Sequence, residues 1–391
     1  MIEASKGEGG GARLACGMVG GGEGAFIGEV HRKALAFDGK AQIVAGSFSR
    51  DMKKTLATGA SLGIAEDRLY SSYEEMARSE GKRSDGIDFV SIVTPNNLHF
   101  PIAKVFLDNG INVVCDKPLV WSSEEAEELK RIAKAKNLLF CVTYTYTGYP
   151  MVKHARHMVA NGDIGEIRFV SAEYTQDWLA TPLEATGAKQ AVWRTDPKQA
   201  GIANCLGDIG THVENTVSYI TGLRIESVCA RLDTFVKGRP LDDNASVMVN
   251  YTSGARGIYW TSQIAVGHDN DLRVRIFGTK GAIEWVQENP NYLTVSHLDK
   301  PGEQLSRGRD KLYPDAAKFS RIPGGHPEGY PEAFANVYRA FCEALIKKST
   351  GGSLSNDDMD FPDLDAGADG VKFVEKCVES SKKGSSWITL K

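Results

Sequence analysis

The chain has 391 residues, which is more than one ordinary hydrophobic core accommodates, so its length predicts two or three domains. A hydrophobic content of 42% and a charged content of 25% are typical of a globular protein, and a net charge of -4 provides no basic surface for nucleic acid or an anionic membrane. No apolar run approaches the roughly 20 residues of a membrane span. We therefore expect a cytoplasmic protein with a small-molecule partner.

Two features of composition set further expectations. Residues 1–12 are polar and Gly-rich without the apolar region of a signal peptide, which predicts a flexible N-terminal segment. The seven cysteines are scattered and contain no C-x-x-C pair. Neither a disulfide framework nor a cysteine-based metal site is predicted, and most cysteines should be small buried residues.

Residues 13–146 alternate strand-length apolar runs with helical patterns, which is typical of βαβ units. Capping boxes at Ser72 with Glu75 and at Ser122 with Glu125 mark two of the helix starts. The pattern predicts an α/β fold with a doubly wound parallel sheet, whose strands should span 14–19, 41–47, 89–94, 111–115 and 138–143.

A glycine-rich turn follows the first strand. It contains Gly20 and Gly22 in a G-x-G-x-x-A pattern, and a helix should begin near Phe26 and Ile27. Between a strand and a helix, small residues let the backbone approach a pyrophosphate while the helix N-terminus supplies N–H donors. The turn predicts a dinucleotide site, with a flexible turn as the alternative. Gly28 is a candidate for close packing of the helix.

The residues after the second strand bear on the choice between NAD and NADP. An acidic residue there would hold the ribose hydroxyls of NAD, whereas an arginine accommodates a 2′-phosphate. The sequence places Ser49 and Arg50 at this point, with no acid before Asp51. Both cofactors therefore stay open, and Arg50 could equally stack on adenine or face water.

The third strand ends in a turn that should border the cofactor. Thr94, Pro95 and Asn96 favour a turn at the carboxyl end of the strand. His99 either contacts the dinucleotide or packs against the following helix.

The fourth strand ends in Asp116-Lys117-Pro118. Ligands of an open parallel sheet bind outside the carboxyl ends of its strands, so Lys117 should face a ligand crevice. The alternative is a lysine that starts a loop and points into solvent.

Residues 147–391 change in character to longer alternating segments rich in β-branched and aromatic residues. With few helices between them, they predict an α+β domain with a large, mostly antiparallel sheet. Strands are expected at 167–174, 227–235, 245–251, 257–263, 272–277 and 282–286. Helical patterns return at 331–347 and 366–382, after a polar excursion over 299–327.

Asp208 and His212 precede a helical pattern in this second domain. On a helix they would project from one face, where the carboxylate could favour the imidazolium or fix the ring tautomer. The alternatives are a helix N-cap by Asp208 and a buried structural pair. No third ligand clusters with them, so no metal site is predicted.

In this order and spacing, the glycine-rich turn, the Thr94 turn, Lys117-Pro118, and Asp208 with His212 resemble the glucose-fructose oxidoreductase and inositol dehydrogenase (Gfo/Idh/MocA) family. The likeness covers residue 14 to the C-terminus. Segments 143–150 and 189–194 are similar to the branch that includes levoglucosan dehydrogenase and glycoside 3-dehydrogenases. Two departures are Asp116, where the family more often has Glu, and the longer glycine-rich turn.

The resemblance implies a hydride transfer between a secondary ring hydroxyl and NAD or NADP, with NAD favoured, and the narrower likeness points to C3 as the oxidised position. His212 is the candidate general base, Lys117 would bind the reacting oxygen, and Asp208 would orient His212 or bind a hydroxyl. Asp116 would join the cofactor site. A wall of polar and aromatic residues suits a sugar or cyclitol: Tyr144, Tyr146, Tyr149, Gln176, Asp177, Trp178, Trp193, Arg194 and Asn204. Several of these could instead pack in the core.

Two other functions remain open at this point. A glycoside hydrolase or lyase could use NAD transiently, and a non-catalytic regulator could bind a dinucleotide without needing Lys117, Asp208 and His212. The resemblance also implies a homodimer or homotetramer formed through the second sheet.

Overall fold

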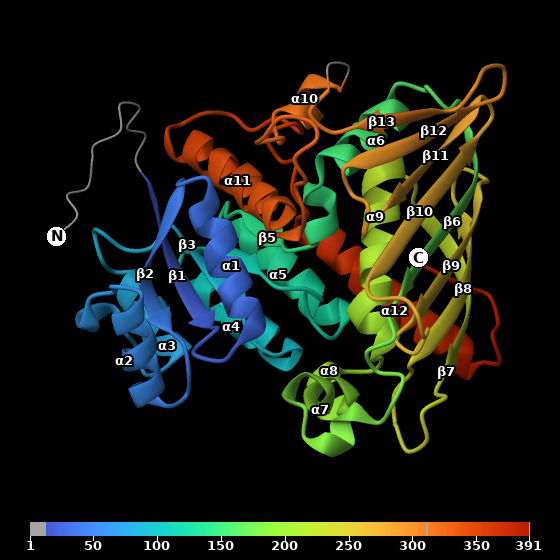
Figure 1. The fold of residues 1–391 in the computed structure, drawn as a ribbon. Helices are drawn as coiled ribbons and strands as arrows, with labels where there is room; N and C mark the ends of the chain where they lie inside the picture. Colours follow the sequence, from blue (N-terminus) through green and yellow to red (C-terminus); the bar gives the residue numbers. More distant parts are fainter. Residues whose placement is uncertain (1–12, 310–311, 391) are drawn as a thin grey trace.

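The structure is a computed structural model that describes residues 13–309 and 312–390, so the predicted flexible segment 1–12 lies outside the described residues. The first domain holds a five-stranded parallel sheet in the order β2-β1-β3-β4-β5 (Figure 1). Its strands lie close to their predicted positions: β1 Leu14–Gly20, β2 Ala41–Ser47, β3 Phe89–Val93, β4 Asn112–Cys115 and β5 Phe140–Val142. The predicted doubly wound sheet is confirmed.

Residue alternation along these strands assigns helices to both faces of the sheet. Cys16, Phe89 and Val114 pack in one cluster with α1 (Phe26–Phe37), whereas Val90 and Val113 pack in another with α3, α4 and α5. The helices of this second face are α3 Tyr73–Glu80, α4 His99–Asp108 and α5 Ser123–Ala135. Helix α2 (Met52–Ser61) follows β2. As the capping boxes predict, Ser72 caps α3 and Ser122 caps α5.

One helix of the C-terminal segment completes the first domain. Helix α11 (Tyr330–Ser349) packs against α1, and its Phe334, Tyr338 and Phe341 join the cluster that covers the first sheet. Helix α12 (Leu364–Lys382) instead contacts α5 of the first domain and β7 of the second sheet. The C-terminal chain therefore ties the two halves together (Figure 1).

The second domain is built on a nine-stranded sheet in the order β13-β12-β11-β10-β6-β9-β8-β7-β14. Every neighbouring pair is antiparallel except β6 and β9, which run parallel. The strands are β6 Ile167–Thr175, β7 Ile225–Asp233, β8 Asn244–Tyr251, β9 Arg256–Ser262, β10 Asp271–Gly278, β11 Gly281–Val286, β12 Tyr292–His297, β13 Glu303–Ser306 and β14 Ile388–Thr389. Strands β12 to β14 were not predicted.

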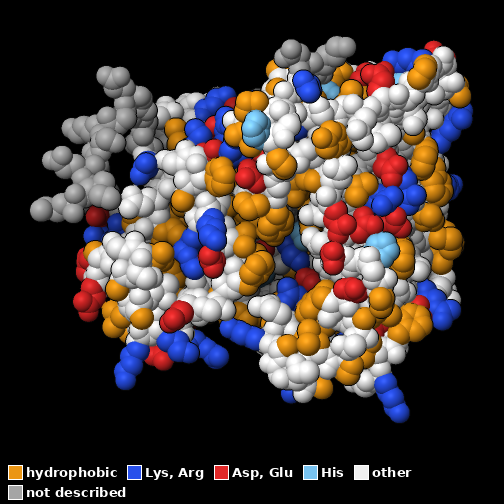
Figure 2. Space-filling model, in the orientation of Figure 1, with side chains coloured by type: hydrophobic (Ala, Val, Ile, Leu, Met, Phe, Trp, Pro, Cys, Tyr) orange, Lys and Arg blue, Asp and Glu red, His pale blue; other side chains and the backbone are white. Residues whose placement is uncertain are grey.

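The two faces of this sheet differ. Helices α6 (Pro150–Ala160), α9 (Thr211–Thr221) and α12 cover the inner face, which turns toward the first domain. No helix of the described part of the chain covers the outer face (Figure 1). Short helices α7 (Lys189–Thr195) and α8 (Pro197–Ala200) form a projection below, and α10 (Pro314–Ala317) lies near α6. Figure 2 shows hydrophobic side chains gathered on the α7–α8 projection.

All seven cysteines are free, and all but Cys229 are buried, which confirms them as small core residues. Among residues 13–309 and 312–390, no helix combines the length and apolar character needed to cross a membrane.

Candidate active site

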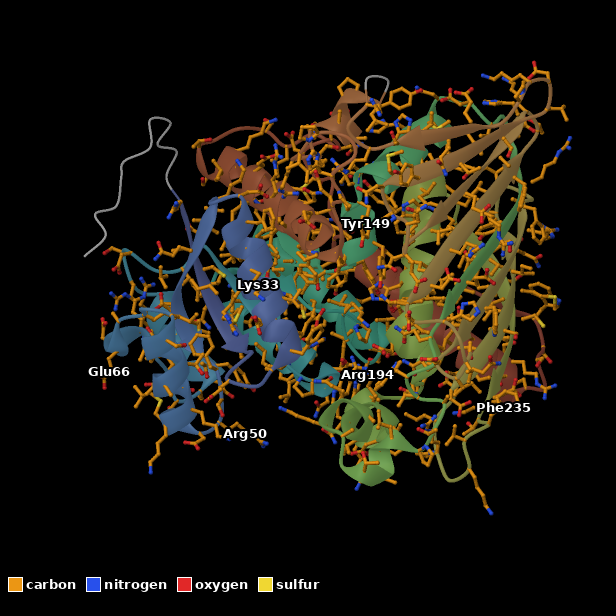
Figure 3. The ribbon with its side chains drawn as sticks, viewed as in Figure 1. Lys33, Arg50, Glu66, Tyr149, Arg194 and Phe235 are labelled. Atoms are coloured by element: carbon orange, nitrogen blue, oxygen red, sulfur yellow. The ribbon has the colours of Figure 1, made fainter. Side chains whose placement is uncertain are left out.

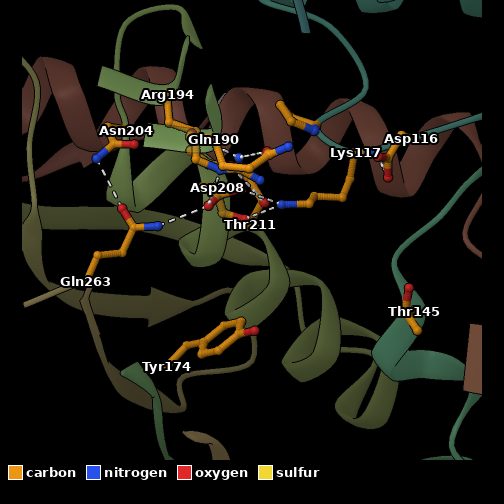
Figure 4. Close-up of polar contacts among 12 residues, drawn as sticks. Asp116, Lys117, Thr145, Tyr174, Gln190, Arg194, Asn204, Asp208, Thr211 and Gln263 are labelled. Atoms are coloured by element: carbon orange, nitrogen blue, oxygen red, sulfur yellow. Dashed lines mark hydrogen bonds and ion pairs between the residues drawn. The ribbon is translucent and has the colours of Figure 1, made fainter. Parts of the chain in front are cut away.

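The two domains meet through a contact between Lys117 and Asp208. Lys117 Nζ donates to Asp208 Oδ1 at 2.8 Å and to the Asp208 carbonyl oxygen at 2.7 Å (Figure 4). Both side chains are largely buried. Lys117 therefore does not point into solvent. Its position directly after β4 places its ammonium group against the second domain.

The Asp208 carboxylate has further partners, but His212 is not among its hydrogen-bond partners. Its Oδ2 accepts from Arg194 Nε at 3.0 Å and from Gln263 Nε2 at 3.0 Å (Figure 4). Burial alone would raise the pKa of Asp208, but the charges of Arg194 and Lys117 hold it well below its usual range. The sequence left Asp208 either to orient His212 or to bind a substrate hydroxyl. Among the described residues its carboxylate makes no hydrogen bond to His212, so any effect of Asp208 on the ring acts through its charge.

The chain around Asp208 explains this difference. Leu206–Gly210 forms a π-helical turn, and α9 begins only at Thr211. The wider turn changes the i, i+4 alignment that a regular α-helix would give. Asp208 also does not cap α9, whose N-cap residue is Gly210. The N-cap alternative is thereby excluded.

His212 lies in a pocket of aromatic rings. It is 7% exposed, and its ring centroid lies 4.7 Å from that of Tyr146 and 5.8 Å from that of Tyr144. Burial, reinforced by the nearby charge of Lys117, lowers the pKa of His212 well below its usual value, while Asp208 acts in the opposite direction. The imidazole is therefore neutral at neutral pH, and its buried Nδ1 has no hydrogen-bond partner among the described residues.

The two predicted tyrosines differ in what they offer a substrate. The Tyr144 hydroxyl lies in the core against Gly370 of α12. A Cβ on Gly370 would lie 2.5 Å from the Tyr144 hydroxyl oxygen. This position favours the packing alternative for Tyr144 over substrate binding. Tyr146 instead shares a hydrogen bond with Tyr174, whose hydroxyl donates to Asn270 at 2.6 Å. Tyr146 and Tyr174 both border His212.

Two of the other predicted wall residues, Trp178 and Trp193, lie beside Arg194. Its guanidinium carbon lies 4.2 Å from the Trp193 ring centroid and 5.7 Å from that of Trp178. Trp178 Nε1 in turn donates to Gln176 at 3.0 Å. Figure 3 shows Arg194 at the top of the α7 segment, between the first domain and the second sheet. The structure therefore joins Trp178, Trp193 and Arg194 to Asp208.

The glycine-rich turn has the shape of a phosphate cradle. Gly20 and Gly21 have positive φ, and a Cβ on Gly28 would lie 2.4 Å from the Gly21 Cα, so α1 approaches the turn as closely as only glycine permits. Helix α1 has no side-chain cap at Ala25, which leaves its first N–H groups available. These residues fit a dinucleotide pyrophosphate.

The predicted cofactor residues Phe26 and Ile27 occupy the first turn of α1. Phe26 is 69% exposed beside the glycine-rich turn, whereas Ile27 packs against the core. Phe26 is therefore the more accessible of the two, and Ile27 holds the helix on the sheet.

The loop after β2 carries no free acidic side chain. Asp51 caps α2 by accepting from Lys53 N at 3.0 Å, and the Ser49 hydroxyl accepts from Asp51 N. Arg50 is exposed, at the edge of the first domain that faces the α7–α8 projection (Figure 3). The loop geometry leaves both NAD and NADP compatible with this position.

The turn after β3 is fixed by His99. Its Nδ1 lies 2.8 Å from the Pro118 carbonyl oxygen and its Nε2 lies 3.0 Å from that of Thr94. Both ring nitrogens are thus occupied, which favours the packing alternative over a cofactor contact. Thr94 Oγ1 is buried without a partner among the described residues, while Pro95 is exposed and Asn96 partly so. Thr94 is therefore the better placed for a cofactor contact.

Asp116 supports the backbone of the Lys117 corner. Its Oδ1 accepts from Lys117 N and from Thr143 Oγ1, each at 2.9 Å. The same oxygen lies 4.0 Å from the buried His31 Nε2. The carboxylate is therefore committed to the ends of β4 and β5.

Gln263, one of the Asp208 partners, was not predicted as a site residue. It follows the alternating segment of β9, where Tyr259 and Thr261 are buried. A polar residue at the next inward-facing position after β9 was the signal in the sequence that could have marked Gln263 as a site residue. It could not reveal the partner, because Asp208 lies 55 residues away in the sequence.

The fold and these contacts define a two-domain, NAD-binding oxidoreductase. Residues 14–144 match the oxidoreductase family with an NAD-binding Rossmann fold, and residues 152–284 match the GFO/IDH/MocA C-terminal domain. The chain belongs to the Gfo/Idh/MocA family.

Several relatives cover nearly the whole chain. The uncharacterized oxidoreductase YfiI of Bacillus subtilis is 38% identical, over 96% of both proteins. An inositol dehydrogenase homolog from Azotobacter vinelandii is 37% identical over 96% of this chain and 97% of its own, with TM-scores of 0.92 for its NAD+ complex and 0.88 for its complex with NADH and myo-inositol. Levoglucosan dehydrogenase of Pseudarthrobacter phenanthrenivorans is 29% identical over 96% of this chain and 98% of its own. A levoglucosan dehydrogenase solved with NADH and levoglucosan has a TM-score of 0.83 at 25% identity, over 97% of this chain and 100% of its own.

Proposed function

We propose that the protein is an NAD-dependent dehydrogenase that oxidises a secondary ring hydroxyl of a sugar, anhydrosugar, glycoside or cyclitol. The observation that carries the proposal is the pairing of Lys117 with Asp208 beside the neutral, buried His212. A protein that only bound a dinucleotide would not need this set of proton-handling groups at the junction of the domains.

Lys117 would bind the oxygen that becomes the carbonyl. Its ammonium has three N–H donors, of which two engage Asp208 and one remains for a substrate hydroxyl. A positive charge at this oxygen stabilises the negative charge that develops as the proton leaves. NAD, when bound, supplies the hydride acceptor.

His212 would accept the hydroxyl proton. Its pKa is lower than the value near working pH that the sequence suggested, because burial disfavours the imidazolium. The ring is therefore unprotonated and ready as a base, and the Asp208 charge favours the imidazolium once it forms. Asp208 thus assists His212 through its field rather than through a hydrogen bond.

The surrounding residues support a polyhydroxylated ring as substrate. Arg194, Gln176 and Trp193 combine hydrogen-bonding groups with a flat indole face, which suits the mixed polar and C–H surface of a sugar. The relatives solved with myo-inositol and levoglucosan carry the same kind of ligand. Oxidation at C3 of a pyranose is the position we propose to test first.

We further propose that two or four copies associate through the outer face of the second sheet. Met248, Ile258 and Trp260 are exposed on neighbouring strands and line a hollow in this face together with Arg231 and Arg275. An exposed apolar patch with a charged rim is typical of a subunit interface.

The test is a substrate screen. The purified protein is incubated with NAD or NADP and, in turn, with monosaccharides, anhydrosugars, glycosides and inositols, and NAD(P)H absorbance is followed. We expect reduction of NAD with a stoichiometric keto product. Release of an aglycone without net NADH would instead establish the hydrolase or lyase alternative.

A further inference from the structure

We propose that Gln263 is a positioning residue for the reaction, because its amide, oriented by Asn204, fixes the Asp208 carboxylate against Lys117. The inference rests on the proposed function. It adds a residue from the second sheet that touches neither Lys117 nor His212 by hydrogen bond and that acts only through Asp208.

The position of Gln263 suits this role. The side chain is 0% exposed and its Nε2 donates to Asp208 Oδ2 at 3.0 Å. Arg194 donates to the same oxygen but comes from the partly exposed α7 segment. Gln263 comes directly after β9 and its backbone N–H bonds the Asp243 carbonyl. Of the two donors to Oδ2, Gln263 is the one anchored in the sheet.

The direction of the Gln263 amide follows from a main-chain carbonyl, which can only accept. Asn204 Nδ2 donates to the Asp242 carbonyl oxygen at 3.1 Å, so this atom is the amide nitrogen. Its second hydrogen goes to Gln263 Oε1 at 3.0 Å. Gln263 must therefore present its own NH₂ group to Asp208, and Asp208 must accept.

Asp242 holds the other end of this chain of contacts. Its carboxylate accepts from Asn204 N at 2.7 Å and from Leu206 N at 2.8 Å. Leu206 begins the π-helical turn that carries Asp208. Asp242 thus holds the backbone beside Asp208 and, through Asn204, orients the Gln263 amide that binds the Asp208 side chain. Figure 4 shows the contacts that run from Asn204 through Gln263 to Asp208.

This arrangement favours an ionised Asp208 that keeps Lys117 in place. A glutamine at 263 supplies a donor without adding charge, whereas a glutamate would place a second carboxylate beside Asp208. The titratable and charged groups that act on Asp208 from the surrounding elements are Lys117, Arg194, Tyr174, Cys205, His212 and Tyr330. Each of these stays unchanged in a variant at 263.

The variants are Gln263→Leu and Gln263→Glu, measured with the polyol that the wild-type protein oxidises best. We expect kcat to fall about 10- to 100-fold in Gln263→Leu, the range for a lost hydrogen bond to a charged group, while the Kd for NADH changes less than about twofold. In Gln263→Glu the acid limb of the kcat/KM profile should move up by about one pH unit, because a second carboxylate beside Asp208 favours the imidazolium of His212 and so raises the pKa of the base.

The matched control is Asn250→Leu, which removes another sheet amide, one that donates to the Ser227 hydroxyl at 3.0 Å. It should leave kcat and the acid limb unchanged. A purely structural role for Gln263 predicts lower kcat in both variants without movement of the limb. Either that outcome or near-normal kcat in folded Gln263→Leu overturns the proposal.

A measurement without turnover separates this inference from the proposed function. The Asp208 carboxyl resonance, identified in ¹³C spectra by its loss in Asp208→Asn, is recorded at pH 7 in the wild type, in both variants and in Asn250→Leu, with NADH present. We expect its chemical shift to change in both Gln263 variants and to stay at the wild-type position in Asn250→Leu. An unchanged shift in the Gln263 variants overturns the role of Gln263, whereas a changed shift in a protein that oxidises none of the polyols would refute only the proposed function.

Discussion

Lys117 Nζ lies 2.8 Å from Asp208 Oδ1, although the two residues are 91 positions apart and belong to different domains. The corner after β4 delivers the lysine, and the turn before α9 delivers the carboxylate. Because the pair is largely buried, removal of either charge would leave the other buried without its partner, which is energetically unfavourable. This contact links the cofactor domain to the proposed substrate site.

Replacement of Lys117 by alanine should lower kcat by at least about 100-fold, because the reacting oxygen loses its charged donor. NADH binding, followed by fluorescence, should persist. Lys104→Ala is the matched control, since Lys104 pairs with Glu128 on the surface of the first domain and should leave kcat unchanged. Near-normal turnover in Lys117→Ala contradicts its assigned role.

Replacement of His212 by alanine should also lower kcat by at least about 100-fold. In the wild type the pKa of His212 is lowered, so the ring stays unprotonated below the usual histidine pKa of about 6.5. The kcat/KM profile should therefore be flat from pH 8 to 7 and fall only at lower pH. A midpoint above pH 7 for the acid limb contradicts this account of the base.

Gly28→Ala should weaken NADH binding by at least about tenfold, because the added Cβ would meet the Gly21 Cα and displace the phosphate cradle. Gly329→Ala provides the control, since a Cβ there has no neighbour closer than 3.9 Å. Fluorescence titration with NADH measures both. Equal affinity in the two variants would remove the glycine-rich turn from the cofactor site.

Glu214 predicts a pH dependence of folding stability. It is buried on α9, and burial, with a smaller effect from Asp369, raises its pKa from 4.5 to about 8. The folded protein therefore retains a proton that the unfolded chain releases above about pH 4.5. The stability that this proton provides is lost as pH rises to about 8, at roughly 1.4 kcal/mol per pH unit.

Glu214→Gln should remove this slope, so that the free energy of unfolding declines less between pH 5 and 8 than in the wild type. Glu66→Gln is the control, because Glu66 lies exposed at the outer edge of the first domain (Figure 3). Urea unfolding at several pH values measures the difference. Parallel curves for wild type and Glu214→Gln contradict the assignment.

Local patterns predicted the architecture well. The alternation of apolar runs with helical patterns located the five strands of the first sheet. The position of Lys117 directly after a buried strand predicted that it lies at the edge of the sheet where ligands bind. Strand β13 is a short polar strand inside the polar excursion, where alternation is weak, whereas β12 alternates exposed residues with buried Leu293 and Val295, a signal that the prediction missed. The parallel pairing of β6 with β9 depends on register across the sheet, which no local pattern encodes.

The site was harder to predict where partners come from distant segments. The Asp208 and His212 spacing assumed a regular helix, whereas the π-helical turn redirects the carboxylate to Lys117, Arg194 and Gln263. Tyrosine is a residue type that suits a sugar-binding wall, yet the Tyr144 hydroxyl faces the core because α12 packs against it. Residue type alone does not give these directions.

The central claim is that a ring C–H hydrogen is transferred to NAD. Its most direct test is incubation of the protein and NAD with a ring-deuterated form of the best substrate, starting with myo-inositol and levoglucosan, followed by mass spectrometry of the reduced cofactor. We expect one deuterium in each NADH formed and an equal amount of ketone. NADH without deuterium, or product formation without any NADH, would contradict the assignment as a ring-hydroxyl dehydrogenase.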